Sequence, residues 1–375
     1  MKIAQVSPLF ESVPPKTYGG TERVVSYLTE ELVRQGHEVT LFACADSNTR
    51  ARLIAPVAHS ARADVRRPSW LSAACIELDM VAAHANEFDV IHFHTDYLHF
   101  PLSRRLDVPH LTTLHGRLDL PELQSLFHYF DDVPLVSISE QQRKPVSWAA
   151  WLGTVHHGLP RNLYRQGEGS GGHLAFVGRF SPEKGAHEAI RIALRSQTPI
   201  YLAAKIEAAD SAYYESEVAP LMQHPLVHYV GEVGEGAKRE LLAGARALLC
   251  PIAWPEPFGL VMIEALACGT PVIAYRHGAV PEIVEHSATG FIVDDQDQAV
   301  EAVHALGRLQ RARCRAAFEE RFSVEAMTAC YLQLYRRLQR GEALPGRALR
   351  STGAFGTRPE SGMNVINGNS GAHHG

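Results

Sequence analysis

The chain has 375 residues, of which 46% are hydrophobic and 21% are charged, a composition typical of a globular protein long enough for two domains. Its net charge of −5 argues against general nucleic-acid binding, and no apolar run approaches the length of a membrane span. The six cysteines are scattered without close pairs. We therefore expect reduced thiols and a cytoplasmic protein, without a disulfide framework or a cysteine zinc site.

Short apolar strands alternate with amphipathic helices along the first half of the chain. The amino-terminal segment MKIAQVSPLF is predicted to contain the first strand. It is not expected to be a signal peptide, because it lacks a basic region followed by an apolar block and a cleavage site. A helix capped by Thr21 is predicted next, and it should end at Gly36. The predicted strands are Lys2–Val6, Val39–Ala43, Val90–His94, His110–Leu114 and Leu135–Ser139.

The second half of the chain repeats this alternation. Helices are predicted near 184–196, 236–245 and 259–268. The sequence RQGEGSGG at 165–172 indicates either a flexible hinge or a surface loop near the domain boundary. The predicted strands are Leu174–Val177, Ile200–Ala204, Val227–Val230, Ala247–Pro251 and Pro271–Tyr275.

This order of elements predicts an α/β protein with two Rossmann-like, doubly wound parallel sheets that face each other across a cleft. We expect an N-terminal domain over 1–160, a C-terminal domain over 161–322 and a further helix over 323–341. Residues 342–375 are rich in Gly, Ser, Pro and Asn without periodicity and are predicted to form a disordered tail. Ligands of such sheets bind at the carboxyl ends of the strands.

The most informative segment is WPEPFGLVMIEALACGTPVIA at 254–274, in which the carboxylates of Glu256 and Glu264 are eight positions apart. Glu264 is the only polar side chain of an otherwise apolar helix, and a buried carboxylate without a partner is costly. The helix begins around 258–260, where unpaired backbone amides favour an anion. A phosphorylated sugar or a nucleotide has both the anion and the hydroxyl groups that this segment could bind.

Two cations and two glycines also occur where a strand is expected to end. Arg179 and Lys184, in FVGRFSPEKG, lie between the first strand of the second half and its first helix. Alone they would be ordinary surface charges, but beside a free helix end they favour a diphosphate site. Gly19 and Gly20 precede the first helix of the chain and form either a tight turn or a loop that lets a ligand approach the backbone.

Three histidines occur in or after predicted strands. His115, in LTTLHG, would point into the cleft, where it could hydrogen-bond a sugar hydroxyl or shuttle a proton, unless its role is structural. His92 and His94 lie on one face of a strand, but no third metal ligand is evident, so we expect neither a metal nor a cofactor. The glycine-rich 167–172 precedes a strand instead of following one, which argues against a nicotinamide dehydrogenase.

These motifs resemble those of the retaining nucleotide-sugar glycosyltransferases of the GT-B fold, of the family 4 type. The resemblance covers roughly residues 1–340, and its most specific part is the E-x7-E signature in EPFGLVMIEALACGTPVIA. The R-x4-K loop and the GGTERVV start support it. One departure is HGLP at 157–160, where many members have Gly-Val-Asp.

The resemblance implies catalytic roles for four residues. Glu256 would lie near the transferred sugar, and His115 near its anomeric carbon. Arg179 and Lys184 would bind the diphosphate and stabilise the leaving group.

The resemblance also implies a donor-binding set, in which Glu264 would accept hydrogen bonds from the ribose. The helix from Ser323 onward would cross back onto the N-terminal domain. The donor-binding residues that it implies are Gly19, Gly20, Arg179, Lys184, Phe258, Gly259, Leu260 and Glu264.

We therefore expect transfer of a hexosyl unit from a nucleoside diphosphate sugar, UDP-hexose being favoured, to an acceptor hydroxyl with retention and without a metal. The sequence leaves the acceptor open among a sugar, a lipid-linked molecule and another small molecule. The alternatives are a nucleotide-sugar epimerase of related architecture and a non-catalytic nucleotide-sugar-binding protein. The five arginines of residues 50–67 are interpreted as part of a solvated helix or loop, with weak peripheral membrane contact as the alternative.

Overall fold

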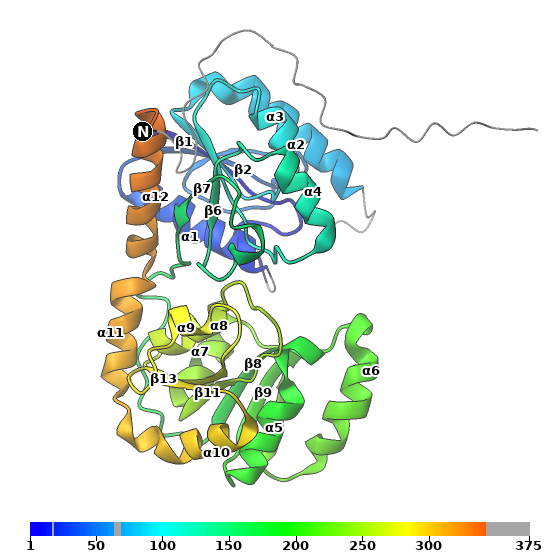
Figure 1. The fold of residues 1–375 in the computed structure, drawn as a ribbon, viewed down its shortest axis with the longest axis vertical. Coiled ribbons are helices and arrows are strands. Elements are labelled where there is room, and N and C mark those ends of the chain that lie inside the picture. The colour runs from blue at the N-terminus through cyan, green and yellow to red at the C-terminus, as the bar shows by residue number, and fades with distance from the viewer. Residues whose placement is uncertain (17–18, 64–68, 343–375) are drawn as a thin grey trace, which may run out of the picture.

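The computed structural model describes residues 1–16, 19–63 and 69–342. Two parallel sheets, each covered by helices, lie one above the other (Figure 1). The predicted fold class, with two Rossmann-like doubly wound sheets facing each other across a cleft, is confirmed. The predicted disordered tail falls outside the described residues, apart from Glu342.

The N-terminal sheet has the strand order β3-β2-β1-β4-β5-β6-β7. The order reverses between β1 and β4, so the loops after these two strands open side by side at the carboxyl edge. Its strands are β1 (Lys2–Val6), β2 (Glu38–Phe42), β3 (Arg52–Ile54), β4 (Val90–Phe93), β5 (His110–Thr113), β6 (Leu135–Ser137) and β7 (Trp151–Thr154), and its helices are α1 (Gly20–Arg34), α2 (Trp70–His84), α3 (Phe100–Ser103) and α4 (Pro121–Tyr129).

The C-terminal sheet has the order β10-β9-β8-β11-β12-β13, so its reversal lies between β8 and β11. Loops that follow these two strands therefore face the N-terminal sheet across the cleft. Its strands are β8 (Leu174–Arg179), β9 (Ile200–Lys205), β10 (Val227–Gly231), β11 (Ala247–Cys250), β12 (Val272–Tyr275) and β13 (Gly290–Val293). The helices of this half and the terminal helices are α5 (Ala186–Arg195), α6 (Ser211–Tyr213), α7 (Glu235–Gly244), α8 (Leu260–Ala267), α9 (Val280–Ile283), α10 (Gln296–Ala305), α11 (Arg311–Arg321) and α12 (Val324–Gln339).

All ten predicted strands are present, with ends that differ by at most two residues, whereas β3, β7 and β13 were not predicted. The expectation of a solvated helix or loop over 50–67 is wrong where β3 forms. Strand β3 is a three-residue edge strand paired with β2, and Arg52 on it binds Glu87 at 2.7 Å. Such a short, charged edge strand lacks the alternating apolar pattern from which strands are predicted. Residues 64–68 of this stretch lie outside the described residues.

Helix α1 begins differently from the prediction. Its N-cap is Gly19, with a φ of 142°, and among the described residues no side chain caps it, so the expected cap by Thr21 is wrong. The backbone reverses at Gly19 in a conformation that favours glycine, and Thr21 is thereby drawn into the first turn. The predicted end is confirmed, because Gly36 has a φ of 85° and donates to the Val33 carbonyl at 3.0 Å.

The chain crosses between the two halves at two places that lie side by side. Leu159 forms a bridge with Ser323, donates to the Phe322 carbonyl at 2.9 Å and accepts from the Val324 amide at 2.9 Å. The glycine-rich loop at 165–172 is not a hinge. It is the surface loop that the sequence allowed, since its Gly167 amide donates to Cys268 at 3.0 Å within the C-terminal half.

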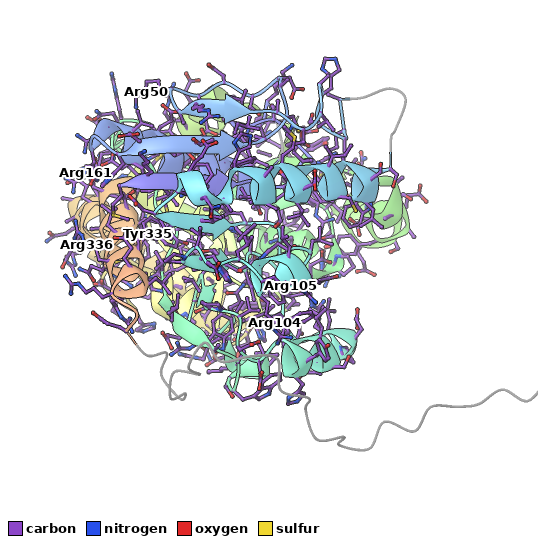
Figure 2. The ribbon with its side chains drawn as sticks, turned by 90° about the horizontal axis from the view of Figure 1, so that it is seen from above. Arg50, Arg104, Arg105, Arg161, Tyr335 and Arg336 are labelled. Atoms are coloured by element: carbon purple, nitrogen blue, oxygen red, sulfur yellow. The ribbon has the colours of Figure 1, made fainter. Side chains whose placement is uncertain are left out.

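Helix α12 runs along the N-terminal half, and α11 lies beside the C-terminal half (Figure 1). The buried side chains of Tyr331 and Tyr335 on α12 pack in one core cluster with Ile3 and Val24. Figure 2 labels Tyr335 together with its exposed neighbour Arg336. The end of the chain's last described helix is thus part of the first domain's core.

In the described part of the chain, no helix combines the length and the apolar content that crossing a bilayer requires.

Candidate donor and acceptor site

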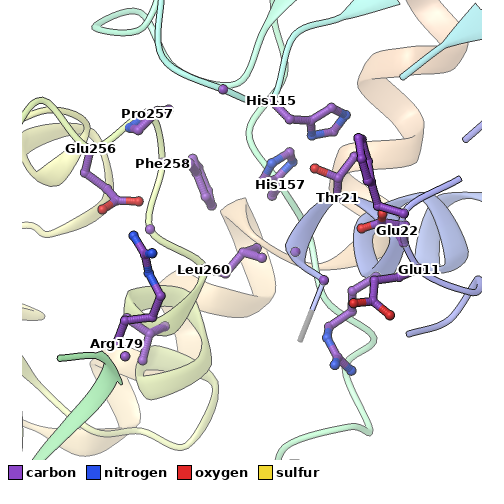
Figure 3. Close-up of a pocket in the computed structure, with 18 of the residues that line it drawn as sticks. Glu11, Thr21, Glu22, His115, His157, Arg179, Glu256, Pro257, Phe258 and Leu260 are labelled. Atoms are coloured by element: carbon purple, nitrogen blue, oxygen red, sulfur yellow. The ribbon is translucent and has the colours of Figure 1, made fainter. Parts of the chain in front are cut away.

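A cleft of about 1160 Å³ separates the two halves at the carboxyl edges of both sheets. Figure 3 shows Arg179 and Glu256 on one side, Glu11 and Glu22 on the other, and His115 between them. Every residue predicted for the site lines this cleft, namely Gly19, Gly20, His115, Arg179, Lys184, Glu256, Phe258, Gly259, Leu260 and Glu264.

Lys184 and Glu256 form an ion pair across the C-terminal side of the cleft. The Lys184 ammonium also lies 5.3 Å from the centroid of the Trp254 ring, and the Trp254 indole donates to Glu256 Oε2 at 2.8 Å. Trp254 and Glu256 belong to the loop between β11 and α8. The first carboxylate of the E-x7-E motif therefore holds the lysine of the R-x4-K loop in an ion pair. The two motifs thus lie next to each other in the cleft.

Arg179 is the last residue of β8 and is surrounded by carboxylates. Its guanidinium lies 2.7 Å from Glu183, 3.3 Å from Glu207 and 3.7 Å from Asp210. The sequence analysis identified the arginine but none of these partners. They orient the guanidinium and offset part of its charge, so an incoming anion must share Arg179 with them.

The amino end of α8 faces the cleft. Gly259 takes a φ of 93° before the helix begins at Leu260, and a side chain there would meet Met262 Cε at 2.5 Å. Among the described residues, the backbone amides of Gly259, Leu260 and Val261 have no hydrogen-bond partner. Gly20 approaches from the opposite domain, and a Cβ on it would lie 3.4 Å from Leu260 Cδ1. The two domains thus come close at a helix end that can bind an anion.

Glu264 is 4% exposed, as its apolar surroundings predict, and its partner is Lys238 of α7, whose Nζ lies 2.6 Å from Glu264 Oε1. Lys238 also lies 3.4 Å from Glu235, which binds Arg23 of the opposite domain at 3.2 Å. No local pattern marks Lys238 in the sequence, and it was missed. Because Lys238 occupies Oε1, Glu264 retains Oε2 as an acceptor toward the cleft.

His115 belongs to a chain of hydrogen bonds that runs to α12. Gln5 Nε2 donates to Tyr335 Oη at 3.1 Å, and Gln5 Oε1 lies 2.9 Å from His94 Nε2. His94 Nδ1 lies 2.9 Å from His115 Nε2. His92, the second predicted candidate on this strand, is bound to Tyr335 at 2.8 Å.

These contacts fix the tautomers of His94 and His115. With the amide of Gln5 oriented as in the structure, Gln5 Oε1 accepts from His94 Nε2–H, so His94 Nδ1 must accept from His115 Nε2–H. Burial holds the pKa of His94 well below its usual value and lowers the pKa of His115 to about 3, so both rings are neutral. His115 Nδ1 is therefore a lone-pair acceptor, and it has no partner among the described residues.

His157, in the segment that departs from the family pattern, also lies in the cleft. Its ring stacks on His115 with centroids 5.2 Å apart and an interplanar angle of 18°, and it meets Phe258 edge-on at 4.9 Å. Burial holds the pKa of His157 well below its usual value. The sequence analysis passed over this residue. Within the described ranges, the structure contains no group of three or more His, Cys, Asp or Glu side chains that could hold a metal ion.

Two family models match the chain. The model for glycosyl transferases group 1 matches residues 169–321, which contain the R-x4-K loop and the E-x7-E motif. The model for glycosyltransferase family 4 matches residues 18–157, which contain Gly19, Gly20 and His115. Together the two matches span most of the chain, one on each side of the cleft.

Individual proteins resemble the chain in part or throughout. An alpha-maltose-1-phosphate synthase of Mycobacterium tuberculosis is 30% identical in an alignment of 187 residues that covers 44% of this chain and 47% of that relative, so the match spans about half of the relative's length. A glycosyltransferase involved in avilamycin A biosynthesis has a TM-score of 0.70 and 25% identity, covering 92% of this chain and 99% of its own. The Anabaena protein HepE in complex with UDP-glucose shares the fold, with a TM-score of 0.68, 19% identity and coverage of 91% and 100%.

Proposed function

Since the chain belongs to the GT-B-fold glycosyltransferases of the group 1 and family 4 type, we propose that it transfers a hexosyl unit from a nucleoside diphosphate sugar to an acceptor hydroxyl. The favoured donor is a UDP-hexose, the anomeric configuration is retained, and no metal is required. The donor assignment is supported by a protein of the same fold that was solved with UDP-glucose.

A single observation carries the proposal. Lys184, Arg179 and the unpaired amides at the start of α8 converge on one cleft. A diphosphate in this position would receive hydrogen bonds from two cations and a helix end, which stabilises the charge that develops on the leaving group. Lys184 has three donors and Glu256 takes one of them, so the ammonium can bind a phosphate without losing that ion pair.

In this proposal the second carboxylate of the motif binds the nucleoside. Glu264 Oε2 would accept from a ribose hydroxyl, while Lys238 binds the other oxygen at 2.6 Å and gives the buried carboxylate a partner inside an apolar helix. His115 Nδ1 would accept from a hydroxyl of the transferred sugar. The neutral imidazole thus positions the sugar instead of shuttling a proton.

The mechanism that we propose depends on whether a carboxylate of the site could act as a nucleophile. The Glu256 carboxylate accepts from both Lys184 and Trp254 through Oε2, and these contacts with an ammonium and an N–H donor lower its nucleophilicity. We therefore favour attack of the acceptor oxygen on the face from which the phosphate leaves. The bond from the anomeric carbon to the phosphate oxygen breaks, the bond to the acceptor oxygen forms, and the departing phosphate takes the acceptor proton.

Calorimetric titration with UDP-, GDP- and ADP-sugars tests the donor assignment, and failure of all three to bind at millimolar concentration contradicts the proposal. NMR of the product then reports the anomeric configuration, and inversion rules out the mechanism. Conversion of the donor when no acceptor is present would point to the epimerase alternative. An assay in the presence of EDTA tests whether activity is independent of added metal.

A further inference from the structure

The N-terminal side of the cleft carries polar groups that the donor site does not use. It is formed by the loop after β1, the first turn of α1, the part of α2 from Trp70 to Glu77, and the loop after β4, and we call it the N-terminal wall. Figure 3 shows two of its acids across the cleft from Arg179. The carboxyl groups of the N-terminal wall are those of Glu11, Glu22, Glu77 and Asp96.

Glu77 is the most unusual of these groups. It lies in the middle of α2 with 1% exposure and lines the cleft. Its Oε1 has no hydrogen-bond partner among the described residues, and burial alone raises the pKa of the carboxyl well above its usual value. Buried polar atoms are almost always hydrogen-bonded in folded proteins, so an orphaned one on a residue that lines a cleft indicates a missing ligand group. A neutral carboxyl can both donate to and accept from a hydroxyl.

Exposed aromatic rings stand beside these acids. Phe10 is 44% exposed and Trp70 is 46% exposed, and their ring centroids lie 5.5 Å apart at an interplanar angle of 38°. Tyr97, from the loop after β4, is 38% exposed. Large aromatic side chains exposed within a cleft mark a binding surface, and their faces suit the apolar C–H face of a sugar ring.

The cations of the N-terminal domain that line the cleft are already paired with carboxylates. Arg62 lies 3.1 Å from Glu11, and Arg117 lies 2.7 Å from Asp119. Arg23 lies 3.2 Å from Glu235 of the other domain. In the described ranges, a phosphate on this wall would therefore have to displace an existing partner, and it would also meet Glu22 and Asp96.

We propose that the N-terminal wall binds an acceptor that has hydroxyl groups but neither phosphate nor carboxylate: a neutral sugar, free or as the terminal unit of a glycoside. Its ring stacks on Phe10 and Trp70, and one of its hydroxyls completes the hydrogen bonding of Glu77. This assignment rests on the proposed glycosyl transfer, because the wall and the donor site share one cleft.

The test compares matched acceptors with the donor that binds best in calorimetry. Glucose, galactose and mannose, their methyl glycosides and their 6-phosphates are assayed for product by mass spectrometry. We expect each neutral sugar that reacts to exceed its phosphorylated counterpart about tenfold or more in kcat/KM, since like charges across a binding surface disfavour the wrong partner. A comparison of the free sugars with the methyl glycosides shows whether the acceptor is a free sugar or the terminal unit of a glycoside.

Two variants and a control test whether the N-terminal wall causes the preference for neutral acceptors. Trp70→Ala should raise the KM of the neutral acceptor about tenfold, with the Kd for UDP unchanged. Ile76→Ala is the matched control, because Ile76 lies on the same helix, is 50% exposed and does not line the cleft. Glu11→Gln should narrow the preference for neutral acceptors, because it releases Arg62 from its ion pair.

The outcomes separate the two proposals. If UDP binds but phosphorylated sugars react better, or if no neutral sugar reacts or shows saturation-transfer NMR contact with the UDP-loaded protein, the acceptor assignment is wrong and the donor site stands. An unchanged acceptor KM in both Trp70→Ala and Phe10→Ala also overturns it. If no nucleotide binds and no donor is consumed, the proposed function itself fails.

Discussion

His94 Nδ1 lies 2.9 Å from His115 Nε2, and this contact decides which nitrogen of His115 keeps a lone pair that can accept a hydrogen bond. The proton on His94 is in turn fixed by Gln5, whose side-chain oxygen lies 2.9 Å from His94 Nε2. A residue on the first strand therefore sets the hydrogen-bonding character of a residue at the site, although neither Gln5 nor His94 needs to touch the substrate.

Replacement of Gln5 tests this relay. Gln5→Leu removes the acceptor for His94, so the tautomers lose their bias and kcat should fall about tenfold, the value of one hydrogen bond. Gln5→Glu is the control, because a buried carboxyl can still accept from His94 and donate to Tyr335. NMR of ¹⁵N-labelled histidine should show His115 protonated on Nε2 in the wild type and in Gln5→Glu only. The same tautomer in Gln5→Leu would contradict the relay.

Loss of Lys184 should act on turnover. Lys184→Met keeps an unbranched side chain of similar length, but the ammonium that would stabilise the leaving phosphate is gone. We expect kcat to fall by about 10²–10³, with a smaller change in donor KM. Steady-state kinetics measure both constants, and Lys144→Met, outside the cleft, is the matched control. An effect confined to donor KM would assign Lys184 to ground-state binding alone.

Glu264 should act on donor binding instead. Glu264→Gln keeps the size of the side chain but weakens acceptance from the ribose, so the Kd for UDP should rise about tenfold or more while the fold persists. Calorimetry with UDP measures the change. Binding as tight as that of the wild type would show that this carboxylate does not contact the nucleoside.

The pair of Glu264 and Lys238 also makes a prediction about stability. Their side chains are 6% and 15% exposed, so Lys238→Met leaves a buried carboxylate unpaired and should lower the free energy of unfolding by about 3–5 kcal/mol. The double variant Lys238→Met, Glu264→Leu should recover most of that loss, since apolar groups replace both partners. It should not recover UDP binding. Urea unfolding and calorimetry on the same samples separate the two effects.

Glu77 predicts how stability depends on pH. Its pKa is raised by burial in the folded protein, so its contribution is fully present below the pKa of the unfolded chain, about 4.3. The contribution is lost as the pH rises toward and through the folded value. In Glu77→Gln the group cannot ionise, so the unfolding free energy should decline less between pH 5 and 9 than in the wild type. Parallel curves for the two proteins in urea unfolding would show that Glu77 does not bind its proton more tightly when folded.

The sequence carried the local information. The alternation of apolar strands and helices predicted both sheets, because the spacing of apolar residues within each segment indicates whether it forms a strand or a helix. Arg179, Lys184, Glu256 and His115 could likewise be singled out, since each lies at or after the carboxyl end of a strand, and these ends meet at one edge of a parallel sheet. The short strand β3 escaped prediction because three edge residues with one charge have no period to detect.

Only the tertiary structure revealed the side-chain partners of the site residues. Lys238 and Glu264 are 26 positions apart, and Gln5 and Tyr335 are 330 positions apart, so no spacing rule links them. In the sequence Glu77 looks like an ordinary polar residue on a helix, whereas the fold buries it in the lining of the cleft. Local pattern specifies which element forms, whereas the charge state, tautomer and pairing of each site residue depend on neighbours that only packing brings into contact.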